Sequence, residues 1–571
     1  MSLITRLNTF SYHADVSLTY DAMPGMVLSS VLVLELVLFT LAWFRFQWAA
    51  RLKSKTPPVW PHIFPVLGPI TTVASYLASR NTVQWILSQR IFYNAIPVKF
   101  RVLKWDINIV QGKENIAQVF RNSAMCSQAA LDKFVLGRIF GMSKSGLELY
   151  DKDDSGHRPK ACAGSQIEPH NRIDYLTFAP VMRFLSGTGM WAFWNRYETE
   201  LDVQLRRLPV SSDWTHISDL ARIFEAHVSA ANTNALCGKY LIDRNPQFLE
   251  DLWELDRNLD HLIRGTPRIF VPRVCARRDR LLVAVKDWHE HARQNYDDSC
   301  ADSNGDDPFW GSRIFRERDS MFDEMDGLSR DDHASQDFGM IWAATRNSVV
   351  AGLWFVIEIF RDPELLRQVR READKCRKVE SGELDIQLLL KNALLQSIYV
   401  EILRLRVHML ITRVPIKQDM KIGDWVIPPG EMIVMSTTIA HRDEADWNTG
   451  EAKEHPLDTF WAERFLSYDE ATQDTPEAAT GPSESCPASS PSFTTDSLRG
   501  KWFPYGGGPR MCPGRHFAKR DIIFTSVFIA TNFGIEFLVD PHSLKMDTRG
   551  FGFGTTSVAG SIPIKMRSRC Q

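Results

Sequence analysis

The chain has 571 residues, of which 44% are hydrophobic and 24% are charged, and its formal net charge is −2. This balance is that of an ordinary folded protein and gives no sign of a nucleic-acid partner. The nine cysteines are scattered without any paired Cys-x-x-Cys spacing. That arrangement argues against a zinc site or a disulfide scaffold and is typical of a reducing compartment.

The N-terminal part of the chain predicts a membrane anchor after a short leading segment, 1–24. Residues 25–45 are apolar apart from Glu35 and the terminal Arg45, and a run of this length can span a bilayer. The basic residues that follow predict that the C-terminal side is cytoplasmic. A buried core helix is the alternative, because of Glu35. A cleaved signal peptide is disfavoured, because the run is too long and starts late.

Residues 46–69 are predicted to form a basic, proline-rich hinge, because closely spaced prolines cannot continue a helix and make a stiff connector. No further domain boundary is evident beyond it, so residues 70–571 are predicted to form one catalytic domain. Within that domain, residues 468–500 are rich in Ser, Thr, Pro, Glu and Asp. Such a segment is too polar to bury and is predicted to be a flexible surface insertion.

Helical patterning dominates the rest of the chain. Residues 337–358 form a long apolar run that is predicted to continue through 361–364, and residues 388–406 show apolar positions at steps of three and four. Short β patterns are fewer and lie at 411–415 and 420–435. The fold class is therefore predicted to be mainly α with small β-sheets.

One cysteine near the C-terminus carries the clearest chemical signal. Gly506 and Gly508 precede Cys512 and let the backbone bend sharply against a flat ligand. A predicted helix at 515–531 follows, with Gly514 near its N-terminus, and helix N–H groups stabilise a thiolate there. A lone thiolate on a glycine loop is suited to be the fifth ligand of an iron porphyrin. The alternative is a buried, inert cysteine.

This segment resembles the haem-binding loop of the cytochrome P-450 family, the haem-thiolate monooxygenases. Both outer glycines, Arg510 and the Cys-Pro-Gly turn fall at family spacing, whereas Tyr505 stands where the family usually has phenylalanine. The resemblance implies a cytochrome P-450 fold holding haem b, an iron protoporphyrin, with Cys512 as axial ligand. It also implies that Arg510 and Arg413 bind the haem propionates. The family's Trp-x-x-x-Arg signal is not found, and Arg172 and Lys160 are the candidates to replace its arginine.

Glu401 and Arg404 lie three residues apart on a predicted helix, where their side chains are neighbours. Such a pair is by itself weak evidence, because most are solvated surface pairs. In the family, a downstream segment similar to the one around Arg464 supplies a second arginine. The resemblance therefore implies a Glu401–Arg404–Arg464 cluster that assembles the haem pocket without taking part in the chemistry.

The predicted oxygen-activating helix departs from the family pattern, which usually reads Ala-Gly-x-Asp/Glu-Thr. Here Ser348 aligns with the threonine, Asn347 with the acid and Thr345 with the glycine. Asparagine cannot ionise and only orients partners by hydrogen bonds. In an alternative register Thr345 is the relay alcohol, and these polar residues are otherwise ordinary packing residues. The asparagine is similar to that of the branch with cholesterol 7α-hydroxylase, sterol 12α-hydroxylase and prostacyclin synthase.

The resemblance implies a membrane-bound monooxygenase that inserts one oxygen atom from O2 into a lipophilic small molecule, such as a sterol or terpenoid of secondary metabolism. Electrons are expected from a separate NADPH-cytochrome P-450 reductase, since no flavin or NADPH domain is visible. The expected location is the endoplasmic reticulum membrane, with a single span and a cytosolic catalytic domain. Two alternatives remain open: a haem-thiolate isomerase or dehydratase that needs no reductase, and a non-catalytic haem sensor.

Overall fold

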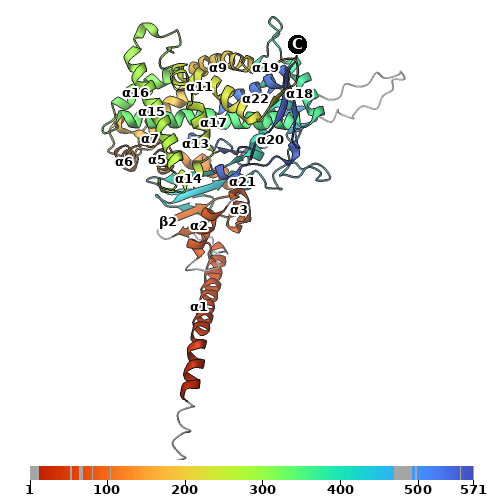
Figure 1. The fold of residues 1–571 in the computed structure, drawn as a ribbon. Coiled ribbons are helices and arrows are strands. Elements are labelled where there is room, and N and C mark those ends of the chain that lie inside the picture. The colour runs from red at the N-terminus through yellow and green to blue at the C-terminus, as the bar shows by residue number, and fades with distance from the viewer. Residues whose placement is uncertain are drawn as a thin grey trace, which may run out of the picture.

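The computed structural model describes residues 12–51, 55–62, 68–79, 81–102, 105–468, 491–494, 498–552 and 554–569. The prediction of a mainly helical fold with small sheets is confirmed (Figure 1). A single long helix projects from a helical body, and a small sheet lies where the two meet.

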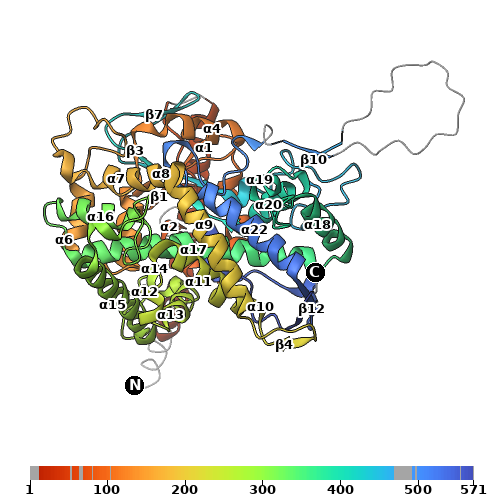
Figure 2. The ribbon, with the colours of Figure 1, turned by 90° about the horizontal axis from the view of Figure 1, so that it is seen from above.

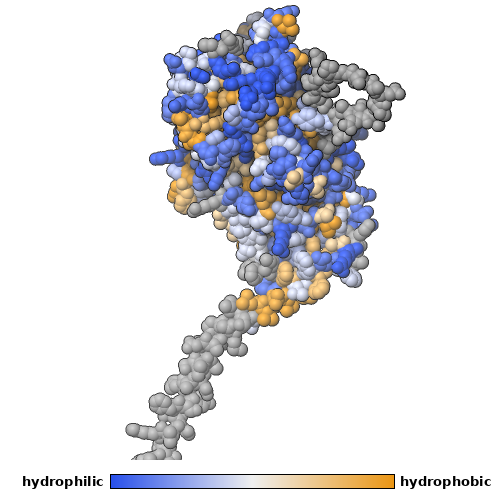
Figure 3. All heavy atoms as spheres, turned by 90° about the vertical axis from the view of Figure 1, so that its right-hand side faces the viewer, coloured by the Kyte–Doolittle hydropathy of each residue, from blue (hydrophilic) through white to orange (hydrophobic). Residues whose placement is uncertain are grey.

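The projecting helix is α1, Tyr12–Arg51. Its Ser30–Arg51 part is long and apolar enough to cross a membrane, and leucines such as Leu32 and Leu36 are more than half exposed. Figure 3 shows this apolar stretch emerging from a body whose visible face is largely hydrophilic. The helix runs through residues 46–51, which the sequence assigns to the hinge. Phe46 is buried there, and its ring centroid lies 5.4 Å from that of Trp60. This contact favours a helix that continues beyond residue 45.

Five strands form the sheet beside α1, in the order β1-β2-β9-β6-β3. The bounds are β1 Val98–Val102, β2 Trp105–Ile109, β3 Cys126–Ser127, β6 Leu410–Pro415 and β9 Met432–Ser436. Strand β6 pairs antiparallel with both β3 and β9, so its central residue Arg413 is carried between them. The predicted strand at 411–415 is therefore present and is extended by Leu410.

The helical body is built around α17, Arg330–Phe360, which is buried along most of its length. A capping box formed by Ser329 and Asp332 fixes its start. Figure 2 shows α17 crossing the body beneath α9, Thr188–Arg206, and α22, Arg515–Asn532. This long apolar helix also meets the length and hydropathy of a membrane span, but its burial makes it the core helix of the body.

Two predicted helices are each interrupted once. Helix α17 ends at Phe360, and Asp362 caps the next helix, α18 Pro363–Lys375, through its side chain. Asn392 likewise caps α20, Ala393–Arg406, and separates it from α19, Ile386–Leu389. In each case a side chain that accepts backbone N–H bonds starts a new helix, and Pro363 adds a first position that needs no N–H partner.

The predicted insertion at 468–500 lies largely outside the described residues, which omit 469–490 and 495–497. Its flanks pair as β10 Leu466–Ser467 with β11 Ser492–Phe493.

The further helices that matter for the site lie on the body and at its sheet edge. They are α3 Thr82–Ser88, α4 Lys113–Asn122, α5 Ala129–Arg138, α7 Ile173–Leu176, α8 Ala179–Ser186, α11 Ser229–Cys237, α13 Phe248–Asp256, α15 Pro272–Asn295, α16 Arg313–Asp323 and α21 Thr437–Ala440. The remaining strands are β4 Thr215–Ile217, β5 Val407–His408, β7 Met420–Ile422, β8 Trp425–Ile427, β12 Phe533–Phe537, β13 Gly554–Thr555 and β14 Ile564–Ser568.

Candidate functional site

The loop that carries Cys512 has the sharp bend that its glycines predict. The backbone N–H of Cys512 donates to the Tyr505 carbonyl over 3.0 Å. Gly506 and Gly508 adopt φ of 68° and 69°, a left-handed conformation that favours glycine. A Cβ on Gly508 would lie 2.5 Å from the Phe120 carbonyl of α4, so the loop packs too closely for any other residue.

Cys512 lies three residues before Arg515, the first residue of α22. Burial raises the pKa of its thiol, whereas the N–H groups of Gly514 and Arg515 and the Arg515 charge act in the opposite direction. The Arg515 guanidinium also donates to the Cys512 carbonyl over 3.0 Å. The cysteine therefore has helix N–H donors at hand, and binding to a metal ion would remove its proton outright.

Tyr505 stands where the family loop usually has phenylalanine, and its hydroxyl is hydrogen-bonded to a neighbouring tyrosine. The Tyr505 and Tyr399 hydroxyls lie 2.7 Å apart, and Tyr399 belongs to α20. The Tyr505 ring also meets the Trp502 ring edge-on, with centroids 6.2 Å apart. The hydroxyl thus ties the Cys512 loop to the helix that carries Glu401.

Arg413 and Arg510 lie beside the loop with one unsatisfied nitrogen each. Arg413 donates from one Nη to the Gly507 carbonyl over 2.7 Å, and Arg510 pairs with Asp174 over 2.9 Å. The Nε atoms of both arginines are buried without a partner among the described residues. Burial lowers the pKa of Arg413 to about 10, and the charge of Arg510 adds to that effect. Two close cations with free donors fit an anionic group such as a haem propionate.

Sequence reasoning missed the two carboxylates that hold Arg510. Asp174 of α7 is fully buried, and Asp132 of α5 reaches the same guanidinium over 3.0 Å. Burial raises the pKa of Asp132 to about 6, against the opposing charge of Arg510. Both residues lie more than 300 residues before Arg510 in the chain, and no local pattern marks them.

The loop before α7 contributes a buried histidine to the same region. His157 contacts the Cys126 carbonyl through Nδ1 over 2.9 Å, while its Nε2 is buried without a partner among the described residues. Arg172 donates to the carbonyls of Gly156 and Pro159, so it anchors the His157 loop. Lys160 is exposed at the surface.

The structure brings Glu401, Arg404 and Arg464 together in one buried cluster. Arg404 binds both carboxylate oxygens of Glu401, over 2.7 and 2.9 Å, and Arg464 binds one of them over 3.0 Å. The remaining guanidinium nitrogens donate to backbone carbonyls, including those of His441 and Leu457. The cluster therefore ties α20 to the segment that precedes the Cys512 loop.

Helix α17 has one accessible strip on its otherwise buried central part. Met340, Ala343, Ala344 and Asn347 are partly or fully exposed, and they recur at the three- and four-residue steps of one helix face. Thr345 is fully buried and its hydroxyl has no partner among the described residues. Of the three polar residues predicted on this helix, only Asn347 belongs to the strip.

Ser348 instead faces a polar cluster on α22. Asp521 is buried there, and it accepts hydrogen bonds from the Tyr197 hydroxyl and from Thr525 over 3.1 Å. Burial raises the pKa of Asp521, whereas Ser348 and the other hydroxyl donors act in the opposite direction. The hydroxyl of Ser348 thus lies between α17 and α22.

Asn347 does not face α22 as Ser348 does, and its contacts are with β13 and with Arg346. Its Oδ1 accepts from the Thr555 backbone N–H over 3.0 Å and from Arg346 over 3.2 Å. Arg346 in turn pairs with Asp256 of α13 over 3.0 Å. Sequence reasoning did not single out Arg346, although an arginine inside an apolar helical run was an available signal.

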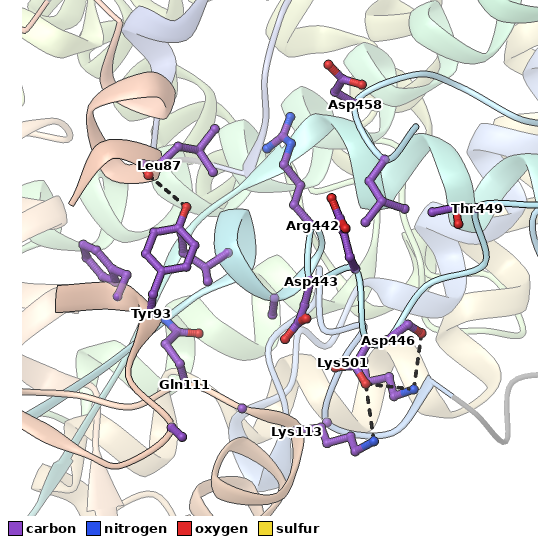
Figure 4. A pocket seen from close by; sticks show the side chains of 18 of the residues that line it. Leu87, Tyr93, Gln111, Lys113, Arg442, Asp443, Asp446, Thr449, Asp458 and Lys501 are labelled. Atoms are coloured by element: carbon purple, nitrogen blue, oxygen red, sulfur yellow. Dashed lines mark hydrogen bonds and ion pairs between the residues drawn. The ribbon is translucent and has the colours of Figure 1, made fainter. Parts of the chain in front are cut away.

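A surface pocket of about 810 Å³ lies elsewhere (Figure 4). Its walls come from α3, the N-terminal end of α4, α21 and the loops around Asp446 and Lys501. Asp446 pairs there with Lys501 over 3.1 Å and with Lys113 over 3.4 Å. These pairs link three segments of the chain, and none of the strip residues of α17 lines the pocket.

Comparisons with known proteins identify relatives of the whole chain. A family model described as Cytochrome P450 matches residues 247–562. Cytochrome P450 monooxygenase fsoE of Humicola fuscoatra is 30% identical over 549 residues, which cover 90% of this chain and 88% of that protein. Cytochrome P450 monooxygenase efuG of Hormonema carpetanum is 28% identical over 564 residues, covering 95% and 96%. Cytochrome P450 monooxygenase calL of Penicillium decumbens is 30% identical over 452 residues, covering 78% and 80%.

Proposed function

Because the chain belongs to the cytochrome P450 family, a family of oxygen-incorporating oxidoreductases, we propose that it is a membrane-attached monooxygenase acting on a lipophilic small molecule. The observation that carries this proposal is the Cys512 loop, with a thiol at the start of α22 and two arginines beside it. The cofactor would be haem b, which supplies dioxygen activation when bound.

The residues around the loop have distinct roles in this proposal. Cys512 would supply the thiolate that binds the haem iron, and the bend at Gly506 and Gly508 and the turn at Gly514 would present it. Arg413 and Arg510 bind the propionates through the Nε atoms that lack a partner among the described residues. Guanidinium N–H donors of this kind are suited to bind a carboxylate such as a haem propionate.

The cluster of Glu401, Arg404 and Arg464 has a structural role in the proposal. All three side chains are buried and hydrogen-bonded to one another or to backbone carbonyls. It therefore keeps α20 and the Cys512 loop in a fixed relationship rather than exchanging protons with a substrate.

On the distal side, Asn347 is the polar residue that reaches the accessible strip of α17. We assign it the role of orienting groups above the haem. Thr345 and Ser348 lie on buried faces, and Ser348 is engaged toward Asp521. Their proposed contribution is to hold α17 in position against α22.

Charge and hydropathy support the proposed membrane attachment and the proposed redox partner. Helix α1 attaches the body to the endoplasmic reticulum membrane as a single span, and a lipophilic substrate such as a sterol or terpenoid enters from the bilayer. Electrons come from an NADPH-dependent reductase on the same membrane. Arg515, Lys519 and Arg520 place positive charge at the start of α22, close to Cys512, where it steers an acidic partner.

A second candidate function rests on Asn347. Its amide cannot ionise, which favours an isomerase or dehydratase that rearranges a peroxide without a reductase. Reconstitution of the full chain with reductase, lipid and a panel of sterols and terpenoids separates the two. The monooxygenase predicts product formation coupled to NADPH and O2 consumption. Product formed from a peroxide without either would contradict it and support the isomerase.

A further inference from the structure

The amide of Asn347 is held in one orientation by two groups that can only donate. The Thr555 backbone N–H reaches Oδ1 over 3.0 Å, and a guanidinium nitrogen of Arg346 reaches the same atom over 3.2 Å. A peptide N–H and a guanidinium have no acceptor lone pair, so the atom that they both meet must be the oxygen. The amide nitrogen therefore points away from them.

Arg346 is itself fixed by a buried anion. Its Nε lies 3.0 and 3.2 Å from the two carboxylate oxygens of Asp256, and the Trp342 indole N–H donates to the same carboxylate over 3.0 Å. Arg346 also donates to the Thr555 carbonyl. Residues of helix α13 and strand β13 thus hold the guanidinium of Arg346 from two sides. These bonds restrict its movement away from Asn347.

The backbone of β13 approaches Asn347 more closely than any side chain would allow. A Cβ on Gly554 would lie 2.2 Å from Oδ1 of Asn347, and the residue has φ +112°. A glycine is therefore required at this position for the Thr555 N–H to reach the amide. Gly552, two residues earlier, has φ +95°, but a Cβ there would meet nothing within 4 Å.

We propose that Arg346, Thr555 and Gly554 form a clamp that presents the Asn347 amide nitrogen as a hydrogen-bond donor on the accessible strip of α17. The Nδ2 atom donates no hydrogen bond to any of the described residues, and Asn347 lies on the accessible strip of α17. The ligand class is an uncharged or anionic oxygen acceptor. This inference rests on the proposed function, in which the strip would face the haem that Cys512 would bind.

The test uses the full-length, haem-loaded protein, reduced and bound to carbon monoxide, whose C–O stretching frequency is lowered by a nearby donor. Asn347→Asp keeps the shape and both clamp contacts, and its carboxylate stays ionised because two donors hold it. This variant replaces the Nδ2 donor by a negatively charged acceptor, and both changes act on the C–O stretch in the same direction. We expect the C–O stretch to move to higher frequency than in the wild type.

Gly554→Ala tests the clamp itself. Its added methyl group displaces the amide, so we expect the same upward shift or a split band. Gly552→Ala is the matched control, because it carries a similar left-handed strain without touching Asn347, and it should keep the wild-type frequency.

The outcomes separate this proposal from the proposed function. A wild-type protein without the red-shifted band of thiolate-bound haem overturns both. If that band is present in the wild type and in all three variants, and neither Asn347→Asp nor Gly554→Ala moves the C–O stretch, only the clamp is overturned.

Discussion

Glu401 and Arg404 form an ion pair with two hydrogen bonds, 2.7 and 2.9 Å long, between side chains that are fully buried. Arg464 adds a third bond to the same carboxylate over 3.0 Å. A single negative charge therefore compensates two buried guanidinium groups. Burying one ion of a pair without its partner is costly in a protein interior, so this carboxylate is the critical member of the cluster.

Replacement of that carboxylate should destabilise the protein strongly. Glu401→Gln leaves Arg404 and Arg464 buried without a counter-charge, and we expect the free energy of unfolding to fall by about 3–5 kcal/mol. Urea titration of the detergent-solubilised full chain measures it. Glu364→Gln is the matched control, because Glu364 pairs with Arg367 at the same three-residue spacing on the surface. The control should cost under about 1 kcal/mol; equal losses in the two variants would contradict a special role for the buried cluster.

Loss of Arg510 should weaken haem retention. Arg510→Leu removes one of the two cations proposed for the propionates, and a charge-assisted hydrogen bond is worth about 1.5–3 kcal/mol. We expect haem to transfer from Arg510→Leu to an excess of an apo-haem protein at least about tenfold faster than it does from the wild type. Arg520→Leu is the control, because that guanidinium lies over the Trp191 ring on the outer side of α22. Unchanged transfer from Arg510→Leu would remove Arg510 from the cofactor site.

His441 should make the protein sensitive to acid. Burial, and then the charge of Arg404, lowers the pKa of this histidine from 6.5 to about 3. A histidine whose folded pKa is depressed stabilises the fold above its unfolded pKa, and that stability is lost as the pH falls below 6.5. Between pH 7 and 5 this group alone should cost about 2 kcal/mol.

The matching variant is His441→Gln, which does not titrate and retains an acceptor for the Phe503 N–H now bound by Nε2 over 3.3 Å. Free energies of unfolding at pH 7, 6 and 5 should converge between the variant and the wild type as the pH falls. Parallel pH profiles would show that His441 does not contribute to the loss of stability.

Helix α1 should account for membrane attachment. Deletion of residues 1–51 removes the Ser30–Arg51 span, and we expect the truncated chain to leave the membrane fraction in alkaline carbonate while the full chain stays. A protease added outside sealed microsomes should digest the body of the full chain, as the cytosolic orientation requires. Protection of the body would reverse the predicted topology.

Local patterns predicted the elements that carry the site. The glycine bend before Cys512, the helix after it and the Glu401–Arg404 spacing each depend on a few neighbouring residues, and all three are present in the structure. The breaks at Asp362 and Asn392 were missed, because a capping side chain inside an apolar pattern was outweighed by the periodicity around it.

Local sequence patterns could not predict the contacts between residues that lie far apart in the chain. Arg510 meets Asp174 across 336 residues, Asn347 meets Thr555 across 208, and Arg346 meets Asp256 across 90. Tertiary packing, not local propensity, decides these contacts. The same reason explains the distal helix. The motif assigns Ser348 to the alcohol position, with Thr345 as the alternative, and Asn347 to the acid position, but only the helix face shows which of them is accessible.

The most direct test of the account is the absorbance spectrum of the reduced, carbon-monoxide-bound full chain, compared with that of Cys512→Ser. The account predicts the strongly red-shifted band of thiolate-ligated haem in the wild type and its loss in the variant, because serine cannot supply the thiolate. Absence of that band from the haem-loaded wild type, or its survival in Cys512→Ser, would contradict the assignment of Cys512 as the iron ligand.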